Sequence, residues 1–213
     1  MHTDKGDLTA KARIRDAAML AFATHGFRVP LRRIAEDAGV SVALITHHYG
    51  TKEALRQVCD DYVLDRYEDI KLMAVADPHS IENELTDMSE ASVATVYMVQ
   101  CFLDPSATTR AFFDRYIDRV RKVLQVSCDA GMIRTEVMNE ESIRLLAMRT
   151  IGHVVAEYAL DPPADPRRFI DDTYTLPTMA ALMELYRGGV FTDSPTIDQY
   201  LEVLRARSGD NNA

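Results

Sequence analysis

Residues 35–55, AEDAGVSVALITHHYGTKEAL, contain two short helical patterns separated by a glycine turn. Gly39 and Val40 lie between the patterns, and Ser41 directly precedes the second one. Glycine readily adopts the left-handed conformation that ends a helix, and a serine hydroxyl caps the first turn of the next helix. The stretch therefore predicts a helix-turn-helix whose second helix, residues 42–48, is too short to fold without packing on its neighbours.

Helical patterns continue on both sides of this stretch. A first helix is expected over residues 9–25, with Gly26 as its left-handed cap. Pro30 suits the first position of the helix that ends at Gly39, because its fixed φ is already helical. A long fourth helix is expected to begin at Thr51 and to connect the N-terminal part to the remainder of the chain.

The rest of the chain shows helical periodicity and no period-two alternation bounded by turn residues, so we predict an all-α fold. Its expected helical segments are residues 81–103, 107–130, 139–160, 165–188 with an interruption or kink at Pro177, and 195–207, followed by a disordered tail. We predict two domains. Residues 1–50 form a three-helix domain with the helix-turn-helix, and residues 51–213 form a helical bundle for effector binding and dimerisation.

Composition places the chain among ordinary folded proteins. Of its 213 residues 47% are hydrophobic and 27% charged, and the chain is long enough for one large or two small domains. No stretch approaches the roughly 20 apolar residues of a membrane span and no signal peptide is evident, so we expect a cytoplasmic protein with no membrane partner. Cys59, Cys101 and Cys128 are an odd number and far apart, which favours buried thiols and leaves a redox-active cysteine as the alternative.

Charge is distributed unevenly along the chain. Residues 1–56 hold nine Lys or Arg against six Asp or Glu, a balance of +3, although the whole chain carries −9. The remaining residues therefore carry −12. A basic N-terminal part on an acidic body is typical of a protein that presents one end to a phosphate backbone.

The stretch 35–55 resembles the signature of the tetracycline-repressor (TetR/AcrR) family. In that family an alanine-glycine-valine-serine turn precedes a recognition helix that ends in an aromatic residue and a lysine-acid pair. The resemblance covers about residues 9–56 and implies a homodimeric regulator of transcription that binds a palindromic operator in double-stranded DNA. The spacing alone also fits a helical hairpin in an ordinary bundle.

The resemblance assigns DNA-binding roles by position. The residues concerned are Arg32, Arg33, Ser41, Val42, Ala43, Leu44, Thr46, His47, His48 and Lys52. Lys52 is expected to hold a phosphate, which the backbone N–H groups at the start of a helix also favour. The reading face is unusually apolar, because Val42 and Leu44 stand where polar base-reading residues are common in the family, and Thr46 stands where the family usually has a tyrosine. We therefore expect base recognition through thymine methyl groups and through Thr46, His47 and Arg32.

Methionine and aromatic residues of the C-terminal part predict either an adaptable apolar pocket or simply a core. The resemblance favours a pocket for a small-molecule effector. Its expected lining is Tyr62, Tyr97, Met98, Cys101, Phe112, Tyr116, His153 and Glu157. His153 and Glu157 lie one helical turn apart and also fit a satisfied polar pair between helices. No metal is expected, because the adjacent His47 and His48 point in different directions.

The helix expected over residues 139–160 is apolar on two faces, one of which carries small residues. A helix of this kind needs two partners, and small residues allow one of them to approach closely. Together with the resemblance, this predicts a two-fold four-helix bundle. The expected dimer interface contains Ile151, Gly152, Val155, Ala156, Ala159, Met179, Met183 and Tyr186.

Our hypothesis from the sequence is a repressor that a small hydrophobic or amphipathic ligand releases from its operator. The first alternative is a DNA-binding regulator that has no small-molecule effector. The second is a helical enzyme, which the sequence disfavours because it contains no GxSxG elbow, phosphate-binding loop or metal-spaced cluster. No cofactor is expected.

Overall fold

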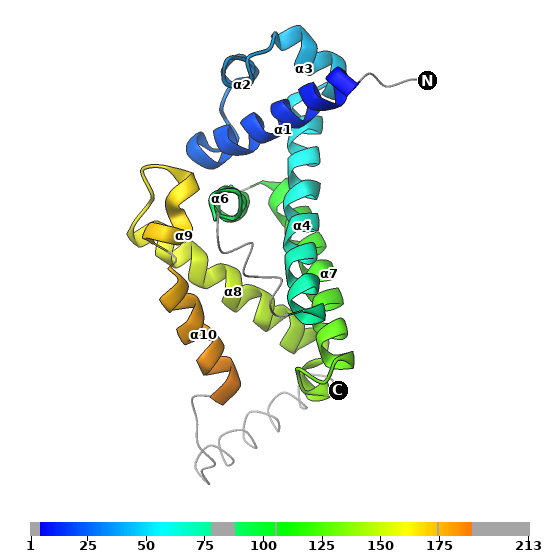
Figure 1. The fold of residues 1–213 in the computed structure, drawn as a ribbon, viewed down its shortest axis with the longest axis vertical. Coiled ribbons are helices and arrows are strands. Elements are labelled where there is room, and N and C mark those ends of the chain that lie inside the picture. The colour runs from blue at the N-terminus through cyan, green and yellow to red at the C-terminus, as the bar shows by residue number, and fades with distance from the viewer. Residues whose placement is uncertain (1–4, 78–87, 105, 174, 189–213) are drawn as a thin grey trace. The chain divides into compact units, whose positions relative to one another are not determined.

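A computed structural model of the chain describes residues 5–77, 88–104, 106–173 and 175–188. It consists of two compact units, residues 1–174 and 175–213. All regular structure in the described residues is helical, which confirms the predicted all-α class (Figure 1). In the first unit the elements are α1 (Lys5–His25), α2 (Leu31–Ala38), α3 (Val42–Tyr49), α4 (Lys52–Ala76), α6 (Ser89–Leu103), α7 (Ala107–Asp129), η2 (Thr135–Val137), α8 (Glu140–Leu160), η3 (Pro166–Arg168) and α9 (Phe169–Asp172). The described part of the second unit is α10 (Leu176–Gly188).

Helices α1, α2 and α3 and the first turn of α4 pack around a small apolar core, and we call this group the head. Its most buried side chains are at most 1% exposed and include Ile14, Phe22, Ile34, Ile45 and Leu55. They come from all four helices, so each helix contributes one apolar stripe to the same core. Burial of these stripes stabilises helices that are too short to persist alone.

The turn between α2 and α3 forms as predicted. Gly39 has a left-handed backbone with φ of 63° and ψ of 40°, and the Ser41 hydroxyl accepts a hydrogen bond from the backbone N–H of Leu44 at 3.1 Å. The prediction for Pro30 is wrong by one position. Its ψ of 148° is extended, so Pro30 precedes α2 and Leu31 is the first helical residue.

Other boundaries also differ from those predicted. Helix α1 begins at Lys5, four residues before the predicted start at Thr9. No proline lies between Lys5 and Thr9 to prevent the helix from starting earlier than predicted. The segment expected over 165–188 divides into η3, α9 and α10, and Pro177 lies in the first turn of α10, where a missing N–H costs nothing. The predicted helix start at residue 81 and the predicted segments beyond residue 188 lie outside the described residues. None of the helices in the described ranges has both the length and the apolar character of a membrane span.

An aromatic cluster joins α1 to α6. The ring of Phe22 lies 5.3 Å from that of Phe27 and 6.2 Å from that of Tyr97, and the rings of Phe27 and Tyr97 are 5.5 Å apart. Beside the cluster, Gln100 of α6 donates a hydrogen bond to the carbonyl oxygen of Ala23 at 3.2 Å. The head is therefore packed directly onto α6.

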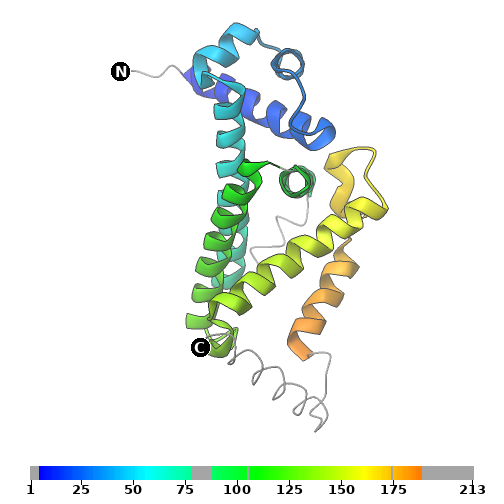
Figure 2. The same ribbon diagram turned by 180° about the vertical axis from the view of Figure 1, so that it is seen from behind.

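Helices α4 and α7 lie side by side in both views (Figure 1 and Figure 2). Acidic side chains of α4 face basic side chains of α7 along this contact. The ion pairs are Asp60–Arg115, Asp61–Arg115, Asp65–Arg119, Glu68–Arg119 and Glu68–Lys122. This row of pairs fixes the register of the two helices, because a slip by one turn would place each acid opposite a different base.

Asp60 is the buried member of the row, with a fully buried side chain. Its carboxylate accepts hydrogen bonds from the hydroxyl of Tyr97 at 2.6 Å and from Arg115 at 3.1 Å, so it connects α4 with α6 and α7. Burial raises the pKa of Asp60, while the Tyr97 hydrogen bond and the charges of Arg56 and Arg115 offset part of that rise.

We predict that Asp60→Asn changes the pH dependence of stability. Because folding raises the pKa of Asp60, the folded state holds this proton more tightly than the unfolded chain does. The corresponding contribution to stability is complete below the unfolded pKa of about 4 and is lost as the pH rises through the raised pKa. From about pH 4 towards neutrality, the wild-type protein should therefore lose stability relative to Asp60→Asn in urea denaturation at fixed protein concentration.

Asp61→Asn is the matched control, because Asp61 is 54% exposed and pairs with the same arginine. Parallel curves of unfolding free energy against pH for the wild type and Asp60→Asn would contradict the prediction. So would an equal change of slope in Asp61→Asn, since the effect would then come from loss of the arginine pair.

Candidate nucleic-acid interface

Helix α3 presents one exposed face and one buried face. Val42, Ala43, Thr46 and His47 are exposed, and Val42 is 39% exposed. Ile45 is 1% exposed and holds the opposite face against the head core. A two-turn helix with exposed side chains at these positions matches the shape of a helix that enters a major groove.

The remaining predicted residues of this region lie at the edges of the exposed face. Ser41 is exposed at the N-terminus of α3, while Leu44 and His48 are half-buried. The rings of His47 and His48 are 5.3 Å apart and tilted by 59°. Among the described residues, no group of three His, Cys, Asp or Glu side chains is arranged to hold a metal ion.

Tyr49 anchors the end of α3 to α1. Its hydroxyl donates a hydrogen bond to the carbonyl oxygen of Lys11 at 2.8 Å. Gly50 then ends α3 with a φ of 76°. The aromatic residue at this position was part of the sequence pattern, but its partner lies 38 residues away and has no local signal in the sequence.

Lys52 makes an internal contact that the sequence did not indicate. Its ammonium donates a hydrogen bond to the carbonyl oxygen of Phe27 at 2.7 Å, and burial lowers the pKa of the lysine. Thr51, directly before it, caps the backbone N–H of Ala54 at 3.1 Å. Lys52 thus ties the start of α4 to the turn between α1 and α2, and its phosphate contact stays a prediction.

Arg32 and Arg33 lie on the exposed side of α2. Arg32 pairs with Glu36 and Arg33 with Asp37, each at 3.0 Å and one helical turn apart. The side chains of Arg32 and Arg33 are 84% and 55% exposed. Because exposed pairs of this type contribute only about 0.3–0.5 kcal/mol, either arginine can exchange its carboxylate for a phosphate at little cost.

Arg56 is a residue that sequence reasoning missed. Its guanidinium lies over the ring of Phe27, 3.4 Å from the ring centre, and donates to Asp104 at 2.8 Å. Only 14% of its side chain is exposed. It therefore joins the head to the end of α6, through a partner 48 residues away in sequence.

The predicted effector residues fall into separate groups. Tyr97, Cys101, Phe112 and Tyr116 are at most 1% exposed and belong to the tightly packed interior, and Met98 is 8% exposed. Phe102 brings this interior together, with its ring 5.9 Å from that of Phe112 and 6.2 Å from that of Tyr116.

The other three predicted effector residues lie apart from this interior. Tyr62 donates from its hydroxyl to Glu90 at 2.6 Å and lines a cavity beside α1. His153 and Glu157 share one face of α8, with Nε2 3.5 Å from Oε1, and each side chain is about one third exposed. Their effector role stays a prediction.

The predicted dimer residues lie on two units. On α8, Gly152, Ala156 and Ala159 are exposed, Val155 is half-buried, and Ile151 is 6% exposed and faces the interior. On α10, Met183 is 56% exposed and Tyr186 is half-buried. The side chain of Met179 lies outside the described residues. The small residues of α8 thus form an accessible stripe, as the sequence pattern required.

Two family models match the chain. Residues 14–59 match a model described as bacterial regulatory proteins of the tetR family. Residues 90–192 match a model described as a tetracyclin repressor-like C-terminal domain. The first match contains α2, α3 and the start of α4, so it covers the exposed face described above.

Individual relatives agree with these matches. The HTH-type transcriptional regulatory protein RaaS of Mycobacterium tuberculosis is 31% identical over 198 residues, which cover 92% of this chain and 93% of RaaS. The HTH-type transcriptional dual regulator CecR of Shigella flexneri is 36% identical over 63 residues, which cover 30% of this chain and 28% of CecR.

Solved structures show the same fold. SmeT, the repressor of the Stenotrophomonas maltophilia multidrug efflux pump SmeDEF, has a TM-score of 0.54 at 21% identity, covering 85% of this chain and 93% of SmeT. The regulator PfmR of Thermus thermophilus has a TM-score of 0.51 at 19% identity, covering 84% of this chain and 100% of PfmR. With RaaS matching over nearly the whole chain, this protein belongs to the tetracycline-repressor family of DNA-binding transcriptional regulators.

Proposed function

We propose that the protein is a dimeric repressor that occupies a palindromic operator and leaves it when a small hydrophobic or amphipathic ligand binds. The observation that carries the DNA-binding part is the exposed face of α3, held in place by Ile45 and Tyr49. A short helix that is fixed from one side and bare on the other is suited to reading base edges.

The exposed side chains suggest which bases are read. Val42 and Ala43 offer methyl groups to thymine methyls. The hydroxyl of Thr46 donates to the carbonyl oxygen of Val42 at 3.1 Å, so its oxygen keeps lone pairs that accept from an adenine or cytosine amino group. The exposed side chains of His47 on α3 and Arg32 on α2 supply further hydrogen-bond donors. We therefore expect an operator half-site with several A·T pairs facing α3.

The dimer is proposed to form through the exposed stripe of α8, together with α10. Besides Gly152, Ala156 and Ala159, this stripe carries large apolar side chains that are well exposed, namely Leu145 at 59%, Met148 at 47% and Leu160 at 83%. Apolar side chains that line up over about four helical turns normally mark a protein interface. A two-fold dimer places two copies of α3 against two half-sites of a palindrome.

Helix α4 is proposed to couple ligand binding to DNA binding. Its first residue, Lys52, contacts the head, Tyr62 in its middle lines a cavity, and Asp60 to Glu68 are paired with α7. A ligand that shifts α4 relative to α7 would therefore move Lys52 and the attached head. Release requires only that the ligand binds the shifted conformation better than the operator-binding one.

A regulator without a small-molecule effector is the second candidate. It is favoured by the close packing of the predicted effector residues, since Tyr97, Phe112 and Tyr116 are at most 1% exposed and lie among other aromatic rings. Screening apolar and amphipathic compounds for a shift of the melting temperature separates the two candidates. A ligand that raises the melting temperature and lowers operator affinity supports the first candidate.

Loss of two basic residues is expected to weaken operator binding. In the variant Arg32→Ala/Lys52→Ala, affinity measured by fluorescence anisotropy on the DNA flanking the gene should fall at least about tenfold, because two contacts to phosphate or bases are lost. The slope of log affinity against log salt should also become shallower, by about one for each phosphate contact removed.

The matched control is Arg110→Ala/Arg134→Ala, which removes the same charge from exposed residues outside the head and outside the proposed dimer helices. It should bind the operator almost as tightly as the wild type does. Unchanged binding by Arg32→Ala/Lys52→Ala would contradict the proposed interface, and so would an equal loss in the control.

A charge on the α8 stripe is expected to break the dimer. Ala156→Glu places a carboxylate where two apolar surfaces would meet, and burial of an unpaired charge is strongly unfavourable. The dissociation constant of the dimer, measured by sedimentation equilibrium, should rise at least about a hundredfold, equivalent to about 2.7 kcal/mol. Thr135→Glu in the exposed turn η2 adds the same charge and should leave the dimer intact. A dimeric Ala156→Glu would place the interface elsewhere.

A further inference from the structure

A cavity of about 660 Å³ lies between the head and helices α4 and α6. Its walls come from α1, the end of α2, Tyr62 of α4, the start of α6 and Arg167 of η3. We call this space the junction cavity. Its volume is within the range of about 300–1,000 Å³ that is typical of small-molecule sites.

The junction cavity has both apolar and charged walls. Met19, Leu20 and Val93 supply apolar surface, and Met19 is only 2% exposed. The guanidinium of Arg15 lies over the ring of Tyr62, 3.8 Å from its centre, and forms a flat cationic wall. A ligand that fits such walls has an apolar body and a polar or charged end.

The charges of the walls favour an anionic end. Each lining carboxylate already has a basic partner, in the pairs Asp16–Arg15 at 2.7 Å, Asp37–Arg33 at 3.0 Å and Glu90–Arg66 at 3.6 Å. Arg13 is bonded instead to a neutral group, since its Nη2 donates to the carbonyl oxygen of Ala38 at 3.3 Å. That bond is long, so a carboxylate or sulfonate offers the Arg13 guanidinium a stronger acceptor.

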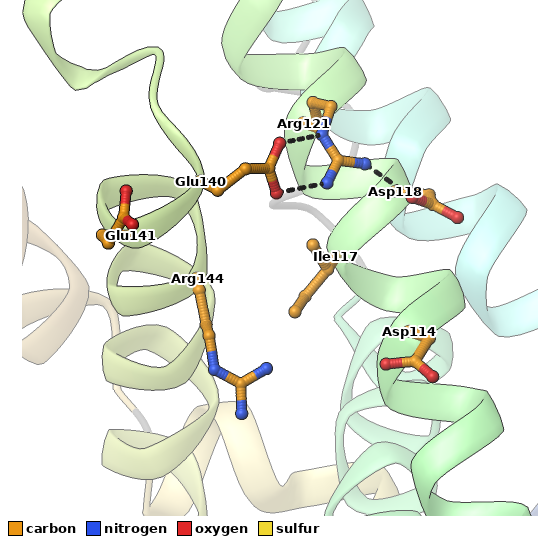
Figure 3. Close-up of a pocket in the computed structure, with 7 residues that line it drawn as sticks. All are labelled: Asp114, Ile117, Asp118, Arg121, Glu140, Glu141 and Arg144. Atoms are coloured by element: carbon orange, nitrogen blue, oxygen red, sulfur yellow. Dashed lines mark hydrogen bonds and ion pairs between the residues drawn. The ribbon is translucent and has the colours of Figure 1, made fainter. Parts of the chain in front are cut away.

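A second cavity among the described residues is smaller, and charged residues make up a larger share of its lining. It has a volume of about 350 Å³, lies between α7 and α8 and is lined mostly by charged side chains (Figure 3). There Arg121 bonds to both Asp118 and Glu140, and Ile117 is the one apolar residue of the lining. Because it is smaller, this cavity offers an amphipathic molecule less apolar surface than the junction cavity does.

We propose that the junction cavity binds an amphipathic anion, with the charged end at Arg13 and the apolar body against Met19, Leu20 and Val93. The proposal rests on the proposed function in one respect, namely that occupancy changes operator affinity. The walls belong both to the head and to helices outside it. A bound molecule therefore contacts α1 and α2 on one side and α6 on the other. It therefore favours one spacing of head and α6 over others.

Binding is tested with 1-anilinonaphthalene-8-sulfonate as a fluorescent anionic probe, and with decanoate and decyltrimethylammonium as competitors of similar chain length and opposite charge. In the wild-type protein, decanoate should displace the probe at concentrations at least tenfold below those of decyltrimethylammonium. Equal displacement by the two competitors would overturn the anionic character of the site.

Variants then locate the site. Arg13→Gln should weaken decanoate binding about tenfold, and Arg13→Lys should restore most of it by keeping the charge. Ala17→Phe should abolish decanoate binding, because Ala17 lines the junction cavity and the larger ring fills it. Arg144→Gln removes an arginine from the second cavity and should behave as the wild type does. Wild-type affinity in both Arg13→Gln and Ala17→Phe would overturn the proposal.

Operator binding separates this proposal from the proposed function. Decanoate should lower the operator affinity of the wild type but not that of Ala17→Phe. If the unliganded protein fails to bind operator DNA, the proposed function fails, while the displacement experiments still decide the binding site. If both decanoate and operator bind without affecting each other, the regulatory role of the junction cavity is overturned.

Discussion

The structure depends on one constraint, which is that α3 has eight residues and cannot be stable as an isolated helix. One of the contacts that fix it is local, and the others reach different parts of the head. The Ser41 hydroxyl caps its first turn, Ile45 fills the head core, and Tyr49 is tied to the carbonyl of Lys11 in α1. Because the exposed side of the helix makes none of these contacts, most substitutions there should cost little stability, and in the proposed function they would change base preference while the fold stays the same.

Helices α1 and α4 link the head to the other helices of the first unit. Both contact helices outside the head, namely α6 and, in the case of α4, also α7. Helix α1 does so through the aromatic contact of Phe22 with Tyr97, and α4 through Arg56 and the carboxylate of Asp60. Removal of Arg115 would leave the buried carboxylate of Asp60 without this charged partner, which is strongly destabilising. The connection through Asp60 therefore stabilises the fold only while its partners are present.

Much of the fold was predictable because its signals are local. Gly39 and Ser41 act within one turn of their own positions, and Gly39 ends α2 and Ser41 caps α3 where the sequence indicated. Contacts such as Arg115 with Asp60 were not predictable, since the two residues are 55 positions apart and any acid could have met any base.

The candidate sites also differ in how far the sequence could predict them. The exposed positions of α3 follow from helix periodicity and the family resemblance. Whether an aromatic residue lines a cavity or fills a core depends on packing between distant helices, which no short pattern encodes. Tyr62 and Tyr97 illustrate this, because both are tyrosines of helical segments and only Tyr62 lines a described cavity.

The pairs Arg32–Glu36 and Arg33–Asp37 on α2 have a consequence for target search. A regulator must leave random DNA quickly, because a genome offers about a million or more competing sites for each operator. If Arg32 and Arg33 contact phosphates as proposed, the two carboxylates would compete with the phosphates of such DNA for the arginines and would weaken purely electrostatic attachment. At the operator, docking of α3 as proposed would position both arginines at once and would favour the exchange of their carboxylate partners for phosphates. In the proposed interface the acids of α2 would therefore weaken binding to random DNA by only about 0.3–0.5 kcal/mol for each pair, and this small loss would shorten the residence there by about twofold for each pair.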